Sequence, residues 1–381
     1  MRVLLDVSGV PAEPVGAGIY TIELARALAA RANLELVLLT RTNDHERWKQ
    51  IAPDREHINK VPAARPLRLV WEAQFGAALA RRSGIDIWHG PHYTLPRALP
   101  CRSVVTVHDL TFFDEPETHE RAKVVVFQNS IRRNARHASR VVCVSHHTAN
   151  RLRALVPQHA PIDVAHHGID HERFHPATDA TRAIDAAALA RIGVRGRFVA
   201  FVGTLQPRKG LPALVAAFAR VHREHPDLKL VLAGGDGWGL DALQTALRTH
   251  RMASSVLRPG YVDDATVAAL YRNATVVAYP SLAEGFGLPA LEAMACGSAL
   301  VTTSGTAMDD FVADGALTVP PNDVDGLADA ISGAMIPATA ARLHTRGPQI
   351  AQRFTWSACA DTHSTIYRSA YDAPRSQHRS S

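Results

Sequence analysis

The chain has 381 residues, of which 46% are apolar and 20% are charged, and its formal net charge is +6. At about 150 residues per domain, this length predicts two domains, each with enough apolar residues to form its own core. The composition excludes a disordered chain, a collagen-like fibre and a small disulfide-stabilised scaffold.

Cysteines and apolar runs indicate the compartment. The four cysteines lie more than 40 residues apart, which is not the spacing of a zinc site and favours a reducing compartment. No apolar run approaches the roughly 18 residues of a membrane span, and the N-terminal run is too short for a signal peptide. We therefore expect a cytoplasmic protein, either free or peripheral at the inner face of the cytoplasmic membrane.

Short apolar runs alternate with helical patterns along the first half of the chain. After the first strand, apolar positions at helical spacing run from Ile22 to Ala29, and Ser145 is suited to cap a later helix that ends near Leu155. This alternation predicts a parallel sheet covered by helices on both faces. Strands are expected at residues 3–7, 34–40, 85–88, 104–107, 140–144 and 163–165.

A polar stretch at residues 170–197 interrupts the alternation, and we place the junction of two domains at residues 172–196. A second series follows, so the fold class is α/β with two doubly wound, Rossmann-like halves. Ligands of such sheets bind beyond the carboxyl ends of the strands, and the cleft between two facing domains is the expected site. The second series has strands at 199–202, 229–233, 275–279 and 299–303 and helices at 211–222, 240–250, 265–272, 289–295 and 324–335.

The segment E-G-F-G-L-P-A-L-E-A-M-A-C-G at residues 284–297 carries the strongest functional signal. Pro289 suits the start of a helix, so the amides of residues 285–288 are expected at a helix N-terminus, where they can bind anions and hydroxyls. Glu284 lies just before this helix and Glu292 about one turn inside it. Both carboxylates are expected at one site; the alternative is an ordinary helix with an acid in its first turn.

A second segment, G-T-L-Q-P-R-K-G at residues 203–210, joins a strand to a helix. Its adjacent cations, Arg208 and Lys209, suit a diphosphate whose negative charge grows as a leaving group departs. From this segment alone, a solvated basic loop is an equal alternative.

Two weaker signals lie in the first half. Gly16 and Gly18 form a glycine-rich turn after the first strand, without the full GxGxxG pattern. His108 and Asp109 follow another strand and suit a polar pair in the cleft, with a structural histidine as the alternative.

The positive charge is concentrated at residues 121–162, which contain eight Lys and Arg and no acid. Read as a helix, residues 121–140 have an apolar stripe and a basic face. Such a helix suits an anionic membrane surface or a diphosphate-linked lipid, with an ordinary solvated face as the alternative. Nucleic acid is not an expected partner, because no nucleic-acid motif accompanies the charge.

The segment at residues 284–297 matches throughout the E-X7-E motif of retaining glycosyltransferases of family 4, which have the GT-B fold. The chain resembles this family over residues 1–372, including its G-x-L-x-P-R-K loop at 203–210 and its H-D-L segment at 108–110. W-E-A-Q at residues 71–74 and H-G-P-H-Y-T-L-P at 89–96 resemble the subgroup of O-antigen and exopolysaccharide mannosyltransferases.

The resemblance implies a domain organisation. Residues 1–172 are expected to form an N-terminal acceptor domain and residues 173–353 a C-terminal nucleotide-sugar donor domain. Residues 354–372 are expected to form a helix that crosses back to the N-terminal domain, and residues 373–381 a disordered tail.

The resemblance also implies the site residues, with neither a metal ion nor another cofactor. Catalytic roles fall to Glu284, His108, Arg208 and Lys209. The expected donor-binding residues are Gly16, Gly18, Gly203, Arg208, Lys209, Val262, Glu284, Gly285, Phe286, Gly287, Leu288 and Glu292. The expected acceptor-binding residues are Tyr20, Trp71, His89, Tyr93 and Asp109.

Four positions depart from the family pattern. Ala17 and Ile19 stand where many subgroup members have Ile and Arg, and Asp310 is the expected substitute for the Glu of a missing Pro-Glu pair. Gly210 stands where relatives often have Asn, a change expected to affect only the start of the following helix.

The predicted function is retaining transfer of a hexose from a nucleotide sugar in surface polysaccharide synthesis. The first choice is mannose from GDP-mannose, moved onto a polyprenyl-diphosphate-linked glycan or a free glycan. The alternatives are a UDP-, ADP- or dTDP-sugar donor, such as one carrying glucose or rhamnose, a non-catalytic sugar- or lipid-binding protein, and a Rossmann oxidoreductase. The last would need the complete GxGxxG pattern, which the first loop lacks.

Overall fold

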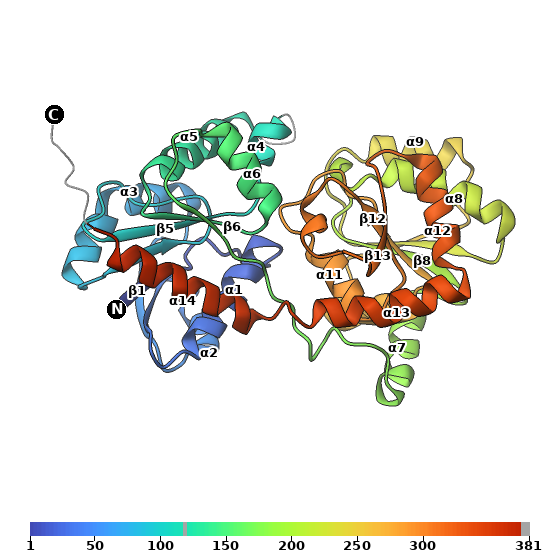
Figure 1. The fold of residues 1–381 in the computed structure, drawn as a ribbon, viewed down its shortest axis with the longest axis horizontal. Helices are drawn as coiled ribbons and strands as arrows, with labels where there is room; N and C mark the ends of the chain where they lie inside the picture. The colour runs from blue at the N-terminus through green and yellow to red at the C-terminus, as the bar shows by residue number, and fades with distance from the viewer. Residues whose placement is uncertain (117–119, 375–381) are drawn as a thin grey trace. The chain divides into compact units, whose positions relative to one another are not determined.

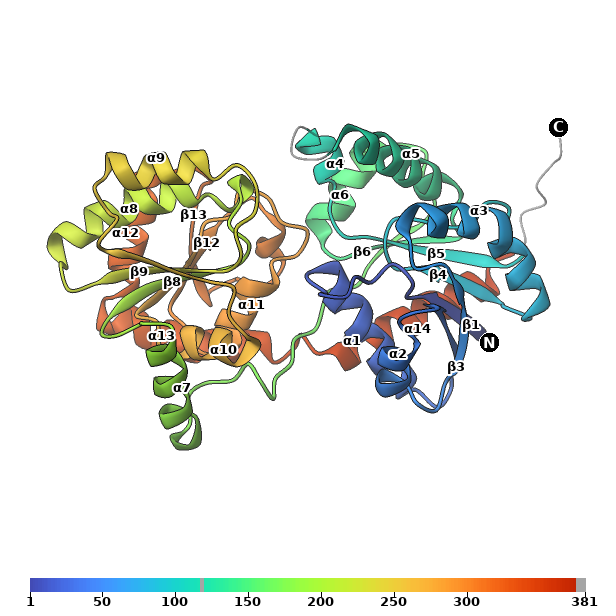
Figure 2. The same ribbon diagram turned by 180° about the vertical axis from the view of Figure 1, so that it is seen from behind.

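A computed structural model of the chain describes residues 1–116 and 120–374. It divides into two compact units, which Figures 1 and 2 show from opposite sides. Unit 1 contains Met1–Gly168 and the last segment from Trp356, and unit 2 contains Ile169–Thr355. The stretch 172–196, where the sequence places the junction, therefore lies within unit 2. Most of the expected tail, residues 375–381, lies outside the described residues.

The sheet of unit 1 is entirely parallel, with the strand order β3-β2-β1-β4-β5-β6-β7. Because the order reverses between β1 and β4, the loops after these two strands flank the topological switch point, where ligands of such sheets bind. The strands are β1 (Arg2–Asp6), β2 (Glu35–Arg41), β3 (Glu56–Val61), β4 (Ile87–Gly90), β5 (Arg102–Val107), β6 (Arg140–Cys143) and β7 (Ile162–Val164).

Helices cover both faces of this sheet, as the alternation of the sequence predicts. One core cluster packs α3 (Arg65–Arg82), α4 (Thr111–Asp114), α5 (Arg121–His137) and α6 (His146–Leu155) against the sheet. The other packs α1 (Ala17–Ala29), α2 (His45–Ile51) and the C-terminal α14 (Trp356–Asp372) against the opposite face. Ser145 caps α6 as predicted, since its side chain accepts a hydrogen bond from the Thr148 amide. The last helix thus supplies part of the core of unit 1.

The sheet of unit 2 is also parallel, with the order β10-β9-β8-β11-β12-β13. Its switch point lies between β8 and β11, so the loops after these strands are placed to bind a ligand. The strands are β8 (Phe198–Val202), β9 (Lys229–Ala233), β10 (Val256–Gly260), β11 (Val276–Tyr279), β12 (Leu300–Thr303) and β13 (Ala316–Val319). The α/β fold class predicted from the sequence is confirmed.

Helices also cover the second sheet (Figure 1). They are α7 (Asp179–Arg191), α8 (Leu211–Glu224), α9 (Asp241–Thr249), α10 (Asp264–Asn273), α11 (Leu288–Ala295), α12 (Val324–Ala334) and α13 (Pro337–Ala351), with 3-10 turns η2 (Pro207–Lys209) and η3 (Ala307–Asp310). The polar stretch 170–197 contains α7, which packs against α10. Among the described residues, none of the helices combines the length and apolarity that crossing a bilayer requires.

Candidate active site

Two loops meet at the switch point of unit 2. One follows β8 and contains Arg208 and Lys209, and the other follows β11 and leads through Glu284 to α11. The carbonyl oxygen of Arg208 accepts a hydrogen bond of 2.7 Å from the Leu282 amide and lies 3.2 Å from the Ser281 hydroxyl oxygen. These contacts tie the basic loop to the loop that carries Glu284.

The Glu284 carboxylate is bonded to both loops. Its Oε1 accepts hydrogen bonds from the hydroxyls of Tyr279 and Ser281, at 2.8 and 2.6 Å, and from the Lys209 ammonium. Its Oε2 lies 3.1 Å from Nη1 of Arg208. The side chains of Glu284 and Lys209 are only 9% and 6% exposed, so this charge cluster is largely shielded from water.

The charges in this cluster stabilise one another. Burial raises the pKa of Glu284, but the charges of Lys209 and Arg208 and the bonds from Lys209 and Ser281 lower it by more, to about 2. Burial lowers the pKa of Lys209 to about 8; the charge of Arg208 adds to this shift and Glu284 opposes it. At neutral pH the site therefore holds two cations and one anion.

The N-terminus of α11 lies directly after the loop that carries Glu284. Gly287 precedes the helix with φ of 98°, and a Cβ there would lie 2.6 Å from the Met308 side chain, so only glycine fits. The Phe286 side chain is 3% exposed and packs on Phe311, with ring centroids 5.2 Å apart. The Phe286 ring is therefore a packing group and offers no surface to a ligand. The amide of Leu288 belongs to the first turn, where helix amides have no partner within the helix.

Glu292 has different neighbours from Glu284. It lies on α11, and burial together with the nearby charge of Asp264 raises its pKa to about 7, while the charge of Arg173 opposes this rise. Asp264 and Arg173 lie outside the loops that hold Glu284, but burial and the charges of both Glu284 and Glu292 raise the pKa of Tyr279. The assignment of Glu292 to the nucleotide ribose stays a prediction.

Two further donor-binding predictions, Gly203 and Val262, fall on the loops after β8 and β10 of unit 2. A Cβ on Gly234 would lie 2.1 Å from the carbonyl oxygen of Gly203, so the loops after β8 and β9 approach each other closely. Val262 is 8% exposed, whereas the side chain of the preceding Tyr261 is 80% exposed. In this loop the surface that a nucleotide base can contact therefore belongs to Tyr261 and not to the predicted Val262.

In unit 1, His108 and Asp109 follow β5 but bond to different partners. Nε2 of His108 lies 2.8 Å from the carbonyl oxygen of Pro91. Asp109 accepts hydrogen bonds from the amide and hydroxyl of Thr111, at 3.1 and 2.8 Å. Burial lowers the pKa of His108, so the ring is neutral at pH 7 and its Nε2–H donates to Pro91. The direct catalytic role of His108 stays a prediction.

Tyr20 and His89, expected at the acceptor, are fully buried between the sheet and α14. The Tyr20 hydroxyl lies 2.8 Å from Nε2 of His363 and 3.1 Å from the Thr106 hydroxyl. His89 lies 2.7 Å from the Tyr367 hydroxyl through Nδ1 and 2.8 Å from the Thr106 hydroxyl through Nε2. These side chains hold α14 on the sheet, and they offer no surface to an acceptor.

The other unit 1 predictions are placed at loops beside the sheet. Gly16 and Gly18 start α1, where the amide of Gly18 donates to the carbonyl oxygen of Val15 at 2.9 Å. Tyr93 is 3% exposed, and its ring packs edge-on against His108 at 6.0 Å. Of the five predicted acceptor residues, Trp71 and Asp109 are half-buried and so retain some exposed surface.

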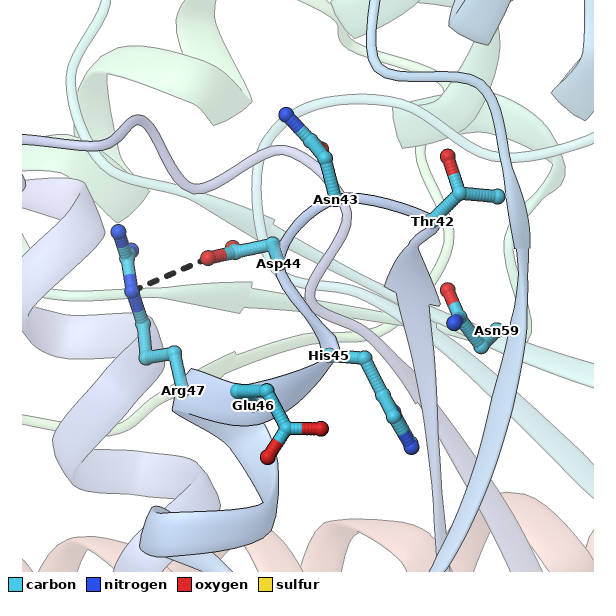
Figure 3. A pocket seen from close by; sticks show the side chains of 7 residues that line it. All are labelled: Thr42, Asn43, Asp44, His45, Glu46, Arg47 and Asn59. Atoms are coloured by element: carbon cyan, nitrogen blue, oxygen red, sulfur yellow. Dashed lines mark ion pairs between the residues drawn. The ribbon is translucent and has the colours of Figure 1, made fainter.

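Unit 1 also has an open polar pocket of about 300 Å³ at the carboxyl ends of β2 and β3 (Figure 3). Its Asp44 carboxylate is already paired, at 3.2 Å from Nε of Arg47 and 3.1 Å from Nη2 of Arg41. No predicted site residue lines this pocket. Its lining residues are Thr42, Asn43, Asp44, His45, Glu46, Arg47 and Asn59.

Known sequences and structures agree with this arrangement. Residues 14–173 match the family described as Glycosyltransferase Family 4, and residues 190–342 match the one described as Glycosyl transferases group 1. The chain is 28% identical to the O-antigen chain mannosyltransferase B of Escherichia coli over 97% of its own length and 100% of that protein. It is 34% identical to a D-inositol 3-phosphate glycosyltransferase of Kribbella flavida, over 61% of this chain and 57% of that one.

Solved structures share the two-unit architecture. Sucrose-phosphate synthase from Thermosynechococcus elongatus superposes with a TM-score of 0.77, at 25% identity, over 98% of this chain and 100% of that one. The Anabaena protein HepE, in complex with UDP and glucose, superposes with a TM-score of 0.73, at 19% identity, over 97% and 100%. The fold is therefore GT-B. With both halves matched by glycosyltransferase families and the E-X7-E segment placed at the switch point of unit 2, the chain is a glycosyltransferase and belongs to glycosyltransferase family 4.

Proposed function

We propose that this glycosyltransferase transfers a hexose from a nucleotide sugar to a growing glycan with retention of configuration. The observation that carries the proposal is the placement of Arg208 and Lys209 beside Glu284 at the switch point of unit 2. Fixed cations at that point suit a diphosphate, and a carboxylate beside them suits the hydroxyls of a sugar.

The charges explain how the donor would be cleaved. Breaking the bond between the sugar and the diphosphate leaves negative charge on the diphosphate, and Arg208 and Lys209 would stabilise that charge in a shielded site. The amides at the N-terminus of α11 would add their dipole. Glu284 would orient the sugar and support the positive charge that develops on its ring. The cations supply the electrostatic stabilisation, so the proposal includes no metal ion.

The identity of donor and acceptor rests on the relatives. The E. coli relative that aligns over 97% of this chain is called an O-antigen chain mannosyltransferase. This favours mannose from GDP-mannose, and a lipid-linked glycan of surface polysaccharide synthesis as acceptor. UDP-, ADP- and dTDP-sugars are the alternatives, since other relatives are called D-inositol 3-phosphate glycosyltransferase and glycogen synthase.

We also propose that α5 contacts an anionic membrane that carries the acceptor. Val125 and Val126 are adjacent on α5 and are 59% and 47% exposed. Arg121, Arg132 and Arg136 are exposed on the same helix. Apolar side chains flanked by arginines suit insertion at the headgroup level of an anionic leaflet.

A donor screen tests the proposal. The thermal unfolding midpoint of the full chain is measured with GDP-mannose, UDP-glucose, ADP-glucose and dTDP-rhamnose, and hydrolysis of each donor is followed in parallel. GDP-mannose is expected to raise the unfolding midpoint more than the other donors do, and to be hydrolysed slowly. Binding without cleavage, with or without added glycan, would favour a non-catalytic sugar-binding protein. No shift with any donor would overturn the proposed function.

A further inference from the structure

The cations of the donor site are paired with a carboxylate of the protein itself. Lys209 and Arg208 bond to opposite oxygens of Glu284. Arg208 also donates to the carbonyl oxygen of Ala283 at 2.9 Å. The two cations assigned to the diphosphate are therefore already paired with an anion of the chain itself.

A diphosphate and the Glu284 carboxylate compete for these cations. An ammonium has three donors, and Lys209 already uses two of them on Glu284 and Tyr279. A diphosphate that approaches Lys209 and Arg208 also approaches the negative charge of Glu284, and like charges repel strongly in a shielded site. Donor binding must therefore weaken the bonds between Glu284 and the two cations.

Two uncharged donors can hold Glu284 when those bonds weaken. The hydroxyls of Tyr279 and Ser281 both donate to Oε1 of Glu284. Tyr279 is the last residue of β11, and Ser281 lies in the following loop, which also carries Glu284. The Tyr279 ring is fixed by stacking on Phe201, with centroids 5.6 Å apart and planes 11° apart. Neither hydroxyl carries a charge that a diphosphate would attract.

We propose that Glu284 competes with the donor's diphosphate for Lys209 and Arg208, and that Tyr279 and Ser281 are positioning residues that keep its carboxylate aligned when the two cations bind the diphosphate. The inference rests on the proposed function, because it assumes a ligand with a diphosphate. Glu284 then has opposite effects on two steps of the reaction. Its carboxylate weakens binding of the diphosphate, and it assists transfer of the sugar.

The first experiment measures binding without turnover. GDP, UDP, ADP and dTDP are titrated calorimetrically into the full chain and into Glu284→Gln, which removes the charge and preserves the shape. The variant is expected to bind the preferred nucleotide about tenfold more tightly, and the matching nucleoside, which lacks the diphosphate, with unchanged affinity. Equal or weaker binding of the nucleotide by Glu284→Gln overturns the inference.

A control separates this effect from net charge. Asp325→Asn removes one negative charge from an exposed ion pair with Arg220 in the same unit, and it is expected to leave nucleotide affinity unchanged. If the wild-type chain binds neither GDP, UDP, ADP nor dTDP, the proposed function itself has failed. If the wild-type chain binds one of them, the comparison with Glu284→Gln decides the inference.

The second experiment tests the positioning residues. Tyr279→Phe retains the ring on Phe201, and Ser281→Ala removes one hydroxyl; each is expected to lower kcat about tenfold while the donor KM and the nucleotide affinity stay within twofold. Ser281→Thr, which retains a hydroxyl, is expected to restore kcat. A raised KM with unchanged kcat in Tyr279→Phe, or no rescue by Ser281→Thr with an unchanged unfolding midpoint, overturns the positioning role.

Discussion

A Cβ atom on Gly210 would lie 2.2 Å from the carbonyl oxygen of Pro280. Gly210 has φ of 66°, which other residues adopt only at a cost. The expectation that this position affects only the start of α8 is therefore too narrow. Its lack of a side chain lets the basic loop pack directly against the loop that carries Glu284.

Gly210→Ala is expected to lower the free energy of unfolding of unit 2 by about 3 kcal/mol, because strain at positive φ adds to overpacking. Urea unfolding followed by far-UV circular dichroism measures the change. Gly193→Ala is the matched control, since Gly193 has φ of 76° in the same unit and nothing lies within 4 Å of its Cβ position. The control is expected to cost about 1 kcal/mol. Equal losses in the two variants would contradict the close approach at Pro280.

Lys209→Ala is expected to lower sugar transfer by about 10²–10³-fold, the usual effect of removing one preorganised group that stabilises developing charge. Glu284 retains its bonds to Arg208, Tyr279 and Ser281, so the unfolding midpoint should change little. Initial rates with saturating donor measure the effect. Lys229→Ala, which removes an exposed lysine of unit 2, should retain the wild-type rate. Wild-type turnover by Lys209→Ala would show that the site is assigned to the wrong loop.

The stability of unit 1 is expected to fall in acid. Burial lowers the pKa of His363 from 6.5 to about 4, so the folded chain keeps this ring neutral where the unfolded chain protonates it. The stability that it contributes is complete above pH 6.5 and is lost as the pH falls toward 4. Between pH 7 and pH 5 the loss should be about 2 kcal/mol.

Tryptophan fluorescence follows mainly unit 1, because four of the five tryptophans, Trp48, Trp71, Trp88 and Trp356, lie there and only Trp238 lies in unit 2. His363→Gln should flatten the pH dependence between pH 7 and pH 5, while being less stable than the wild type at pH 7, where the bond to Tyr20 is intact. An unchanged pH slope in this variant would exclude His363 as the titrating group.

Glu72 is expected to make the folded chain less stable as the pH rises, whereas His363 makes it less stable as the pH falls. Burial and the nearby charge of Asp6 raise the pKa of Glu72 from 4.5 to about 8. Between these values the folded chain holds a proton that the unfolded chain has released, so stability falls as the pH rises toward 8. Glu72→Gln, which keeps an acceptor for the Thr94 hydroxyl, should therefore be more stable than the wild type at pH 9 and not at pH 4. Glu46→Gln, at an exposed site, should show no such crossover.

The membrane contact is expected to depend on the arginines that α5 exposes. Replacing Arg121, Arg132 and Arg136 together with Gln should lower co-sedimentation with anionic vesicles at low salt at least threefold. Arg133 is left unchanged because it donates to the carbonyl oxygen of Pro96 at 3.3 Å. Replacing the exposed arginines at 223, 248 and 251 of unit 2 is the charge-matched control. Equal loss of binding in both triple variants would mean that net charge, and not α5, governs the contact.

The sequence predicts the centres of both sheets better than their edges. All the expected strands exist, with ends shifted by up to two residues. The strands it misses are β3, β10 and β13, all of which lie at sheet edges. They are missed because an edge strand buries less side-chain surface: β3 reads E-H-I-N-K-V, and β10 contains Pro259 and a shift of register.

The site is predicted where the motif and the end of a strand coincide. Arg208, Lys209 and Glu284 are brought together as expected, but the hydroxyls of Tyr279 and Ser281 are not foreseen. Their position at the end of β11, just before Glu284, is the signal that could have found them. His89 is misplaced for a different reason: alternation along β4 directs it, like Ile87, to the face covered by α14. Its partner on that helix, Tyr367, is 278 residues away in sequence, so no local pattern predicts the contact.

The packing of α14 in unit 1 also affects the order in which the two units can fold during synthesis. A ribosome releases residues 1–168 long before residues 356–372, yet Cys359, Ile366 and Tyr367 belong to the core of the first unit. Unit 2 is complete in sequence once Thr355 has emerged, so it can finish folding first. Until α14 emerges, α1 and α2 cover only part of the sheet face that they share with it. Ribosome-associated chaperones would therefore bind the N-terminal half of this protein for longer than its early position in the chain suggests.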